Sequence, residues 1–455
     1  MDAMQPLEKN SSILIIGAGT WGTSIAYRLV KRGYTNIKVL DSNTFPSAIS
    51  AGNDHNKILE EPISPPAADQ SDLDYAWNTI ETLSSEVWRH DPVHAPHYHP
   101  TGFIYAAVGD EAWEKVKAAA EARPDVYAPL EDAEAFRQTM PDGVLTGDLT
   151  GWRGFIRREG AGWVEARDVL LDVHAAAAEG GAVFVCDPRA GRVAELLYDD
   201  GGDGDEVVVG AKTADGATHR ADFTILAAGA GASTLVDFEK QLRPTAWTLG
   251  HVALTADEAP QYAELPVLFN VDGGFFLSPP KSAIAAGEPE LKICDEHPGY
   301  IHLADGKDGG EKQPVPVPRQ AVPRTSATNM HKLLQATVPQ LADRPLLRPR
   351  LCWDADTPDR LFLIARYPRG GSSQRLLVAA GGSGNGFMNA PAVGILVADL
   401  LEDRLEERMA KSLRWRPETA VDRDWFDTQG RFGGAGKVVD LGEIPDDDWV
   451  EGSAK

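Results

Sequence analysis

The pattern of apolar and polar positions near the start of the chain predicts a strand, a helix and a second strand in immediate succession. Ser12–Ile16 contains consecutive aliphatic side chains, which is typical of a short buried strand. In Thr23–Arg32 the apolar residues recur on one face of a helix, and Gly33 can end it because glycine adopts the left-handed conformation. Asn36–Leu40 then predicts a second strand.

The rest of the chain alternates between two kinds of predicted strand. Short, wholly apolar runs typical of a parallel sheet lie near residues 12–41, 182–186, 224–231 and 375–380. Strands of a second type fall between them, at Ala246–Leu254, Val267–Leu277 and Gly287–Pro298. This order predicts an α/β protein with two sheets whose segments are interleaved, so that the domains are discontinuous in sequence.

Helical spacing and turn-forming residues divide the remaining segments. Helices are expected at Asp72–Arg89, Asp110–Ala122, Leu130–Met140, Glu165–Gly180, Thr325–Leu334 and Ala390–Leu405. Irregular or extended structure is expected at Ile58–Ser71, in a surface loop at Lys307–Pro323 and in the tail Arg414–Val439. The final stretch, DDDWVEGSAK, is expected to be frayed.

A glycine motif follows the first predicted strand and suits a dinucleotide. Gly17, Gly19 and Gly22 fit G-x-G-x-x-G: the first allows a tight turn, the second lets the backbone approach a pyrophosphate, and the third lets the helix pack on the strand. The helix N-terminus favours phosphate charge. Asp41, at the end of the second strand, can accept hydrogen bonds from ribose hydroxyls. The motif alone does not separate FAD from NAD.

Further candidates remain open from the residues alone. Thr224–Gly231 is either a turn that closes over a dinucleotide or a tightly packed core strand. Gly381–Phe387 has the glycine content of a backbone that approaches a flat ligand, or of a flexible loop. Cys352 stands beside a tryptophan, where a cysteine is usually a small hydrophobe, and Lys57 lies in a loop, where a lysine is usually surface decoration.

Composition and charge narrow the class of protein. The 455 residues predict about two to four domains. A formal net charge of −24 and a pI near 4.8 argue against nucleic-acid and anionic-membrane partners. No apolar run reaches the about 18 residues of a membrane span, and no zinc-ligand spacing or other metal motif is present. Three cysteines, no signal-peptide pattern and no peroxisomal Ser-Lys-Leu ending favour a cytoplasmic protein.

Longer motifs carry a resemblance to a known family. The stretches SAISAGNDHNK, LKICDEHPGY, CWDADTPDR, GGSGNGFM and TQGRFGG make the chain resemble the fungal fructosyl-amino-acid oxidases (amadoriases), within the wider family of monomeric sarcosine oxidase and D-amino-acid-oxidase-like flavoproteins. The resemblance implies a glutathione-reductase-like Rossmann domain that binds FAD and a substrate domain with a mixed sheet. The expected segments are residues 8–65, 162–245 and 348–410 for the FAD-binding domain, 66–161 and 246–347 for the substrate domain, and 411–455 for a segment that packs across both.

The resemblance also implies roles for single residues. Cys352 matches the cysteine that bonds covalently to the flavin, Lys57 a lysine that assists the reaction with O₂, and Arg431 an arginine that pairs with the substrate carboxylate. Ser278 and Met388 depart from the family, which commonly has glutamate and lysine at these substrate-facing positions. Expected FAD contacts are Gly17, Gly19, Thr20, Trp21, Gly22, Asp41, Ser42, Ala51, Gly52, Asn53, Lys57, Ala228, Gly229, Trp247, Cys352, Gly384, Asn385, Gly386, Phe387 and Met388.

The function implied is a monomeric FAD-dependent oxidase of a secondary amine or N-alkyl amino acid. A hydride leaves the carbon next to nitrogen, the imine hydrolyses, and O₂ gives H₂O₂. Gly273 stands where relatives tend to have a basic residue, which leaves a dehydrogenase with another electron acceptor as an alternative. A non-catalytic FAD-binding relative and an NAD-linked enzyme are further alternatives. The substrate stays open among fructosyl amino acids, saccharopine- or pipecolate-like compounds and N-alkyl amines of secondary metabolism.

Overall fold

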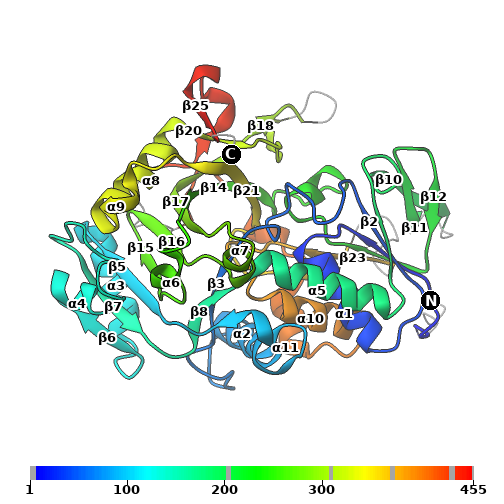
Figure 1. Ribbon diagram of the computed structural model, residues 1–455. Helices are drawn as coiled ribbons and strands as arrows, with labels where there is room; N and C mark the ends of the chain where they lie inside the picture. The colour runs from blue at the N-terminus through cyan, green and yellow to red at the C-terminus, as the bar shows by residue number, and fades with distance from the viewer. Residues whose placement is uncertain (1–6, 201–205, 307–310, 369–374, 430–435, 453–455) are drawn as a thin grey trace.

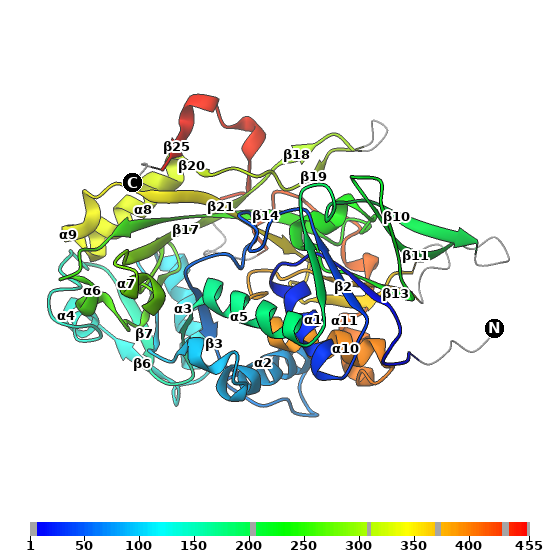
Figure 2. The ribbon, with the colours of Figure 1, turned by 45° about the vertical axis from the view of Figure 1, so that its right-hand side comes forward.

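Two large β-sheets lie side by side in the computed structural model, which describes residues 7–200, 206–306, 311–368, 375–429 and 436–452 (Figures 1 and 2). The first sheet has six strands. In spatial order they are β22 (Leu363–Arg366), β23 (Leu376–Ala380), β13 (Phe223–Leu226), β1 (Ile13–Ile16), β2 (Ile37–Asp41) and β9 (Val183–Cys186). The pairs along it are parallel except β22–β23, which is antiparallel.

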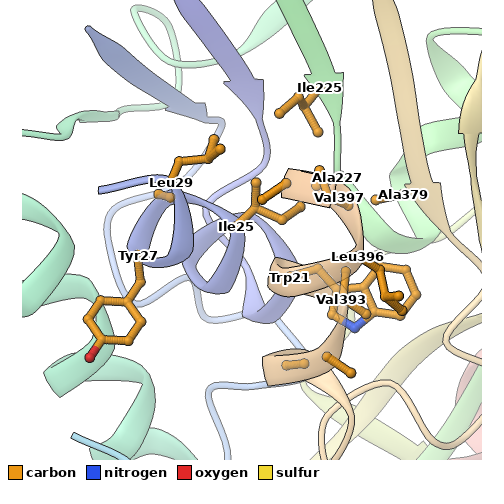
Figure 3. Close-up of a cluster of buried hydrophobic side chains, with 14 of the residues drawn as sticks. Trp21, Ile25, Tyr27, Leu29, Ile225, Ala227, Ala379, Val393, Leu396 and Val397 are labelled. Carbon is orange, nitrogen blue, oxygen red and sulfur yellow. The ribbon is translucent and has the colours of Figure 1, made fainter. Parts of the chain in front are cut away.

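Helices cover the six-stranded sheet and bury its apolar side chains. They are α1 (Thr20–Lys31), α5 (Ala166–Glu179), α10 (Ala390–Leu401), α2 (Asp72–His90) and α11 (Glu407–Leu413). Trp21 and Ile25 of α1 share one buried cluster with Val393 and Leu396 of α10 and Ile225 of β13 (Figure 3). This packing holds the start of α1 against the carboxyl edge of the sheet.

The second sheet has nine strands and is mixed. In spatial order they are β21 (Leu347–Asp356), β14 (Arg243–Ala253), β17 (Glu290–Ile301), β16 (Gly274–Leu277), β15 (Val267–Asn270), β5 (Phe103–Ala107), β7 (Arg153–Arg157) and β6 (Tyr127–Leu130), with β24 (Val439–Asp440) beside β17. The helices α8 (Arg324–Thr337) and α3 (Asp110–Glu121) pack against it.

Four small sheets and several short helices complete the described elements. The small sheets are β3 (Lys57–Glu60) with β8 (Ala161–Val164) and β4 (Tyr98–His99), β10 (Val193–Asp200) with β11 (Glu206–Thr213) and β12 (Thr218–Arg220), β18 (Leu303–Ala304) with β19 (Gln313–Pro314), and β20 (Ala321–Pro323) with β25 (Trp449–Glu451). The short helices are α4 (Ala133–Arg137), α6 (Ala259–Tyr262), α7 (Lys281–Ala285) and α9 (Pro339–Ala342), with 3₁₀ turns at Ala95–His97, Gly229–Thr234, Pro417–Thr419, Leu441–Glu443 and Asp446–Asp448. No helix in the described ranges is long and apolar enough to cross a membrane.

The α/β class and the two interleaved sheets are confirmed, and several boundaries are corrected. The first helix begins at Thr20 instead of Thr23, directly after the glycine turn. The segment expected to be irregular from Ile58 contains β3, because it pairs with β8 about a hundred positions later. Long-range pairing also explains the other errors: the expected loop at Lys307–Pro323 and the expected frayed tail contribute β20 and β25, which pair with each other. The apolar run at Thr224–Gly231 remains a strand only to Leu226.

The predicted domain boundaries stay a prediction. The strand β21 crosses one of them at residue 348, since it pairs with β14 in the nine-stranded sheet. Cys352 therefore belongs to the nine-stranded sheet.

Candidate functional site

The carboxyl ends of the parallel strands β1, β2, β13 and β23 open into one cavity of about 880 Å³. This is the edge at which open α/β sheets bind ligands. The nine-stranded sheet supplies the opposite wall through β14, β15, β16, β17 and β21. A volume of this size accommodates a large cofactor together with a small substrate.

The glycine turn forms one end of the cavity. Gly17 has φ +108°, and a Cβ there would lie 2.5 Å from the carbonyl oxygen of Ala227. A Cβ at Gly22 would overlap the carbonyl oxygen of Gly17. Beside Gly19, in contrast, the Ser50 hydroxyl is the single described atom near a Cβ, at 3.5 Å, so the space there belongs to the cavity.

The start of α1 is arranged to receive an anion. Among the described residues no side chain caps its N-terminus, and its first turn holds no acidic residue. Its amide groups and the positive end of its dipole thus face the cavity without a protein partner of opposite charge. Asp41 accepts hydrogen bonds from the amides of Ala18 (2.8 Å) and Asn43 (2.9 Å), and burial raises the pKa of Asp41. The carboxylate therefore orders the turn and lines the cavity at once.

The last glycine loop is tied to the first. The indole of Trp21 donates to the carbonyl oxygen of Gly386 at 2.7 Å, and the indole of Trp88 donates to that of Met388 at 2.6 Å. The Asp354 carboxylate accepts from the Gly384 amide. Because indoles and a carboxylate hold its backbone, the loop is an ordered wall of the cavity and not a flexible surface loop.

Lys57 and Cys352 meet in the middle of the cavity. Lys57 begins β3, and its ammonium lies 2.8 Å from Asp54 and 3.6 Å from the Cys352 sulfur. Burial opposes the charge of Lys57, but the Asp54 carboxylate holds the pKa of this lysine above its usual value. Cys352 is 7% exposed and lies opposite Trp247, and both line the cavity.

A second lysine joins this charge cluster, and the sequence analysis missed it. The Lys292 ammonium lies 2.6 Å from Asp54 and 2.9 Å from the carbonyl oxygen of Asn56, and Arg350 lies 3.8 Å from Asp54. Although burial opposes its charge, these cations and Lys57 hold the pKa of Asp54 well below its usual value. The signal available in the sequence was a lysine inside the apolar run LKIC.

The far end of the cavity is aromatic with a few polar groups. Phe103, Tyr105, Phe269 and Phe275 line it from three neighbouring strands, with Phe269 and Phe275 stacked at 5.6 Å between centroids. The sequence analysis also missed several polar residues that line this end: Glu60, Lys115, Tyr127 and Arg360. Nothing local distinguishes them from surface residues.

The cavity brings most of the predicted site residues together. Those that line it are Gly17, Gly19, Thr20, Trp21, Asp41, Ser42, Ala51, Lys57, Ala228, Gly229, Trp247, Cys352, Gly384, Asn385, Gly386, Phe387 and Met388. Gly22, Gly52 and Asn53 do not line it and support the wall from behind. A Cβ at Gly52 would overlap the Thr20 hydroxyl, and the Asn53 amide donates to the carbonyl oxygens of Pro46 and Ser47.

Two further residues, Ser278 and Arg431, were expected to contact the substrate. Ser278 does not line the cavity, contrary to the expectation that it faces the substrate. It follows the end of β16 and is buried, and its hydroxyl accepts a hydrogen bond from the amide of Leu265 at 2.9 Å. Arg431 lies outside the described residues, so its contact with a carboxylate stays a prediction.

The residues present fit FAD. A turn that only glycine can adopt, an uncapped helix start and an acid at the end of the second strand suit the adenine dinucleotide. A thiol opposite an indole and a backbone loop with several glycines suit a flat ring in the middle of the cavity. Within the described ranges, no group of three or more His, Cys, Asp or Glu side chains is placed to hold a metal ion.

Comparison with known proteins identifies the family and the fold. Residues 12–400 match the family described as FAD dependent oxidoreductase. Among solved structures, fructosyl amine:oxygen oxidoreductase (Amadoriase I) from Aspergillus fumigatus is 44% identical, with a TM-score of 0.90 over 98% of this chain and 99% of that one. Fructosamine oxidase (Amadoriase II) from the same organism is 40% identical, with a TM-score of 0.90 over 99% of both chains.

The chain is also similar to an oxidase that is named for a different substrate. L-saccharopine oxidase of Schizosaccharomyces pombe is 25% identical over 90% of this chain and 93% of its own length. The chain belongs to the family of FAD dependent oxidoreductases that includes the amadoriases.

Proposed function

We propose that this protein is an FAD-dependent oxidase of secondary amines, with N-substituted amino acids as the substrate class. The observation that carries the proposal is the Lys57 ammonium against the Cys352 thiol, in the wall of a cavity that also holds the dinucleotide turn. Relatives named as oxidases of fructosyl amines and of saccharopine support it, since both compounds contain a secondary amine.

The chain's own residues have distinct tasks in this proposal. Cys352, which is paired with Trp247 on the neighbouring strand, would hold the flavin covalently through its sulfur. Lys57 keeps a positive charge beside the Cys352 sulfur, and this charge would stabilise the negative charge that develops when oxygen is reduced. The aromatic side chains at the far end exclude water and leave the reacting carbon in an apolar environment.

The cofactor supplies the redox chemistry. FAD, when bound, takes the two electrons and the hydrogen of the C–H bond next to nitrogen, and O₂ then receives the electrons as H₂O₂. The imine product hydrolyses in water, and a substrate bound as the neutral amine requires no strong general base. The alternative of a dehydrogenase depended on Gly273, which stands where relatives tend to have a basic residue. Gly273 does not line the cavity, whereas two lysines, Lys57 and Lys292, do, and this weakens that alternative.

The cellular compartment and the oligomeric state of the protein are also proposals. None of the three cysteines, Cys186, Cys294 and Cys352, forms a disulfide bond, which fits a reducing cytoplasm. We propose a monomer in that compartment.

A peroxide-coupled screen of secondary amines with purified holoenzyme tests the function. An active amine should produce peroxide in air and bleach the flavin absorbance without oxygen. Bleaching without peroxide would favour the dehydrogenase. If no secondary amine gives either response, the proposal fails.

A further inference from the structure

The segment between β19 and β20 forms part of the cavity wall, although the sequence predicts a surface loop there. Pro316, Val317 and Pro318 line the cavity. Pro318 is exposed and the two residues before it are half-buried. Residues 314–319, which we call the strap, therefore lie where the cavity meets solvent.

The order of the strands places the strap at the dinucleotide end of the cavity. In the nine-stranded sheet, β14, β17 and β16 separate β21 from β15 and β5, which carry aromatic residues of the far end. Val317 packs against a cluster that contains Trp353 of β21 and Ala230 of the 3₁₀ turn Gly229–Thr234. Because this turn follows the parallel strand β13, the strap borders the sheet edge at which a dinucleotide binds.

Two tryptophans hold the strap in place. In its middle, the carbonyl oxygen of Val317 accepts a hydrogen bond from the Trp353 indole at 2.7 Å. At its end, the Arg319 guanidinium lies over the Trp449 ring, 3.6 Å from the ring centroid. The prolines of the strap have no N–H group to donate, so contacts made by side chains contribute much to its position.

The carboxyl-terminal strand supports the second of these contacts. β25 contains Trp449 and pairs antiparallel with β20, which begins two residues after the strap (Figure 2). Arg324, directly after β20, donates to the Asp448 carboxylate at 2.9 Å. Neither Arg319 nor Trp449 lines the cavity. A change at their contact therefore reaches a bound cofactor only through the strap.

We propose that the strap is the gate through which FAD enters and leaves the protein, and that the contact between Arg319 and Trp449 keeps this gate closed. Local opening of such a segment precedes both entry and release, so weakening its closure raises both rates by the same factor. Kd then changes little. Loss of a residue that binds FAD directly would instead raise the rate of release and Kd together. The inference concerns the cofactor and does not depend on which amine is oxidised.

The rates are measured in Cys352→Ser holoprotein, in which a covalent bond through this cysteine cannot mask release. The flavin found free at successive times after dilution gives the rate of release, and mixing FAD with the apoprotein gives the rate of entry. Trp449→Ala in this background should raise both rates about 3- to 10-fold, with Kd changed less than about 2-fold.

Trp415→Ala is the matched control for loss of a tryptophan near the C-terminus. Trp415 packs against Phe238 and Tyr367 and does not line the cavity, so both rates should stay unchanged. Arg319→Ala removes the other side of the contact and serves if Trp449→Ala does not fold. It should raise the rates as much as Trp449→Ala does, and the double variant should be no faster than either single one.

Hydrogen exchange gives a second measure of opening. The amides of residues 315–320 should exchange faster in Trp449→Ala than in the wild-type holoprotein, by a factor similar to that of the rates. This comparison requires no release of flavin, so it serves if FAD stays attached in the Cys352→Ser protein.

Three results would overturn the inference. The first is that neither the rates nor the hydrogen exchange change in Trp449→Ala. The second is that the two single exchanges add in the double variant. The third is that faster release is accompanied by an equal rise in Kd, which would make the strap a binding surface and not a gate. Because no substrate is added, failure of the proposed amine oxidation would leave all of these measurements unaffected.

Discussion

The Lys57 ammonium lies 3.6 Å from the Cys352 sulfur, although 295 positions separate the two residues in sequence. The thiol and the ammonium thus meet in the wall of one cavity. The same ammonium is held by Asp54 at 2.8 Å, so its position does not depend on the thiol. The relationship allows the roles of the two residues to be tested separately.

The first prediction concerns Cys352. After denaturation in acid, the yellow chromophore of the wild type should remain with the polypeptide, and Cys352→Ser should release it to the supernatant. Cys294→Ser is the matched control, because Cys294 is also buried, forms no disulfide bond and is part of the cavity wall. Chromophore that stays attached in Cys352→Ser would rule out this attachment site.

Lys57 is expected to act on the oxygen half-reaction. Lys57→Met removes the charge that stabilises reduced oxygen, so reoxidation of the reduced flavin should slow much more than its reduction by substrate. Stopped-flow absorbance separates the two steps, and Lys57→Arg, which keeps the charge, should recover part of the rate. Equal slowing of both half-reactions would indicate that Lys57 has a structural role instead.

Asp41 is expected to contribute to retention of FAD. Asp41→Ala removes the acceptor of the Ala18 and Asn43 amides together with the proposed acceptor for ribose, at a cost of about 1.5–3 kcal/mol. Incorporation of FAD into apoprotein, followed by fluorescence quenching, measures this before any covalent bond forms. Asp187→Asn removes an acidic group near the same sheet edge that does not line the cavity, and it should leave incorporation unchanged.

Met388 should influence the choice of N-substituent. It lines the cavity where relatives often have lysine, and Trp88 holds its backbone, so an exchange alters the side chain without moving the loop. We expect the wild type to prefer a carboxylate-bearing amine with a less polar N-substituent over a fructosyl amino acid, since an unpaired buried polyol group costs about 1–3 kcal/mol. Met388→Lys should raise kcat/KM for fructosyl-valine relative to N-methyl-valine. If fructosyl compounds already lead by a wide margin in the wild type, this reading of Met388 is wrong.

Stability should depend on pH through His97. Burial opposes the charge of His97, but Glu165 at 3.2 Å and Asp172 at 2.8 Å raise the pKa of His97 above its usual value of 6.5. A raised pKa in the folded state adds stability that is fully present below the unfolded value and is lost as pH rises through the folded one.

The difference in Tm between the wild type and His97→Gln should therefore be larger at about pH 5.5 than at about pH 8.5. The difference in Tm between the two proteins is measured, and not the Tm of the wild type alone, because other histidines also titrate. Burial lowers the pKa of His94 and His251, so their contributions to stability change with pH in the opposite direction to that of His97. Exchange of the exposed His90 by Gln should give no such trend. A difference in Tm that does not change with pH would show that the pKa of His97 is the same in the folded and unfolded states.

Much of the dinucleotide end followed from the sequence alone, because its determinants are local. The turn at Gly17 requires a positive φ, the helix follows it within three residues, and Asp41 ends the next strand. Such features depend on backbone conformation and short-range periodicity, which a few consecutive residues determine. The errors there were small, such as the start of α1 at Thr20.

The substrate end depended on the tertiary structure. Glu60 and Lys292 belong to the cavity because β3 pairs with β8 and β17 pairs with β14 and β16 in one particular register. A shift of one residue in a strand directs every side chain to the opposite face, so sequence pattern could not decide which face meets the ligand. Ser278, expected to face the substrate, follows the end of β16 and accepts a hydrogen bond from the Leu265 amide, whereas Glu60, in a segment expected to be irregular, lines the cavity.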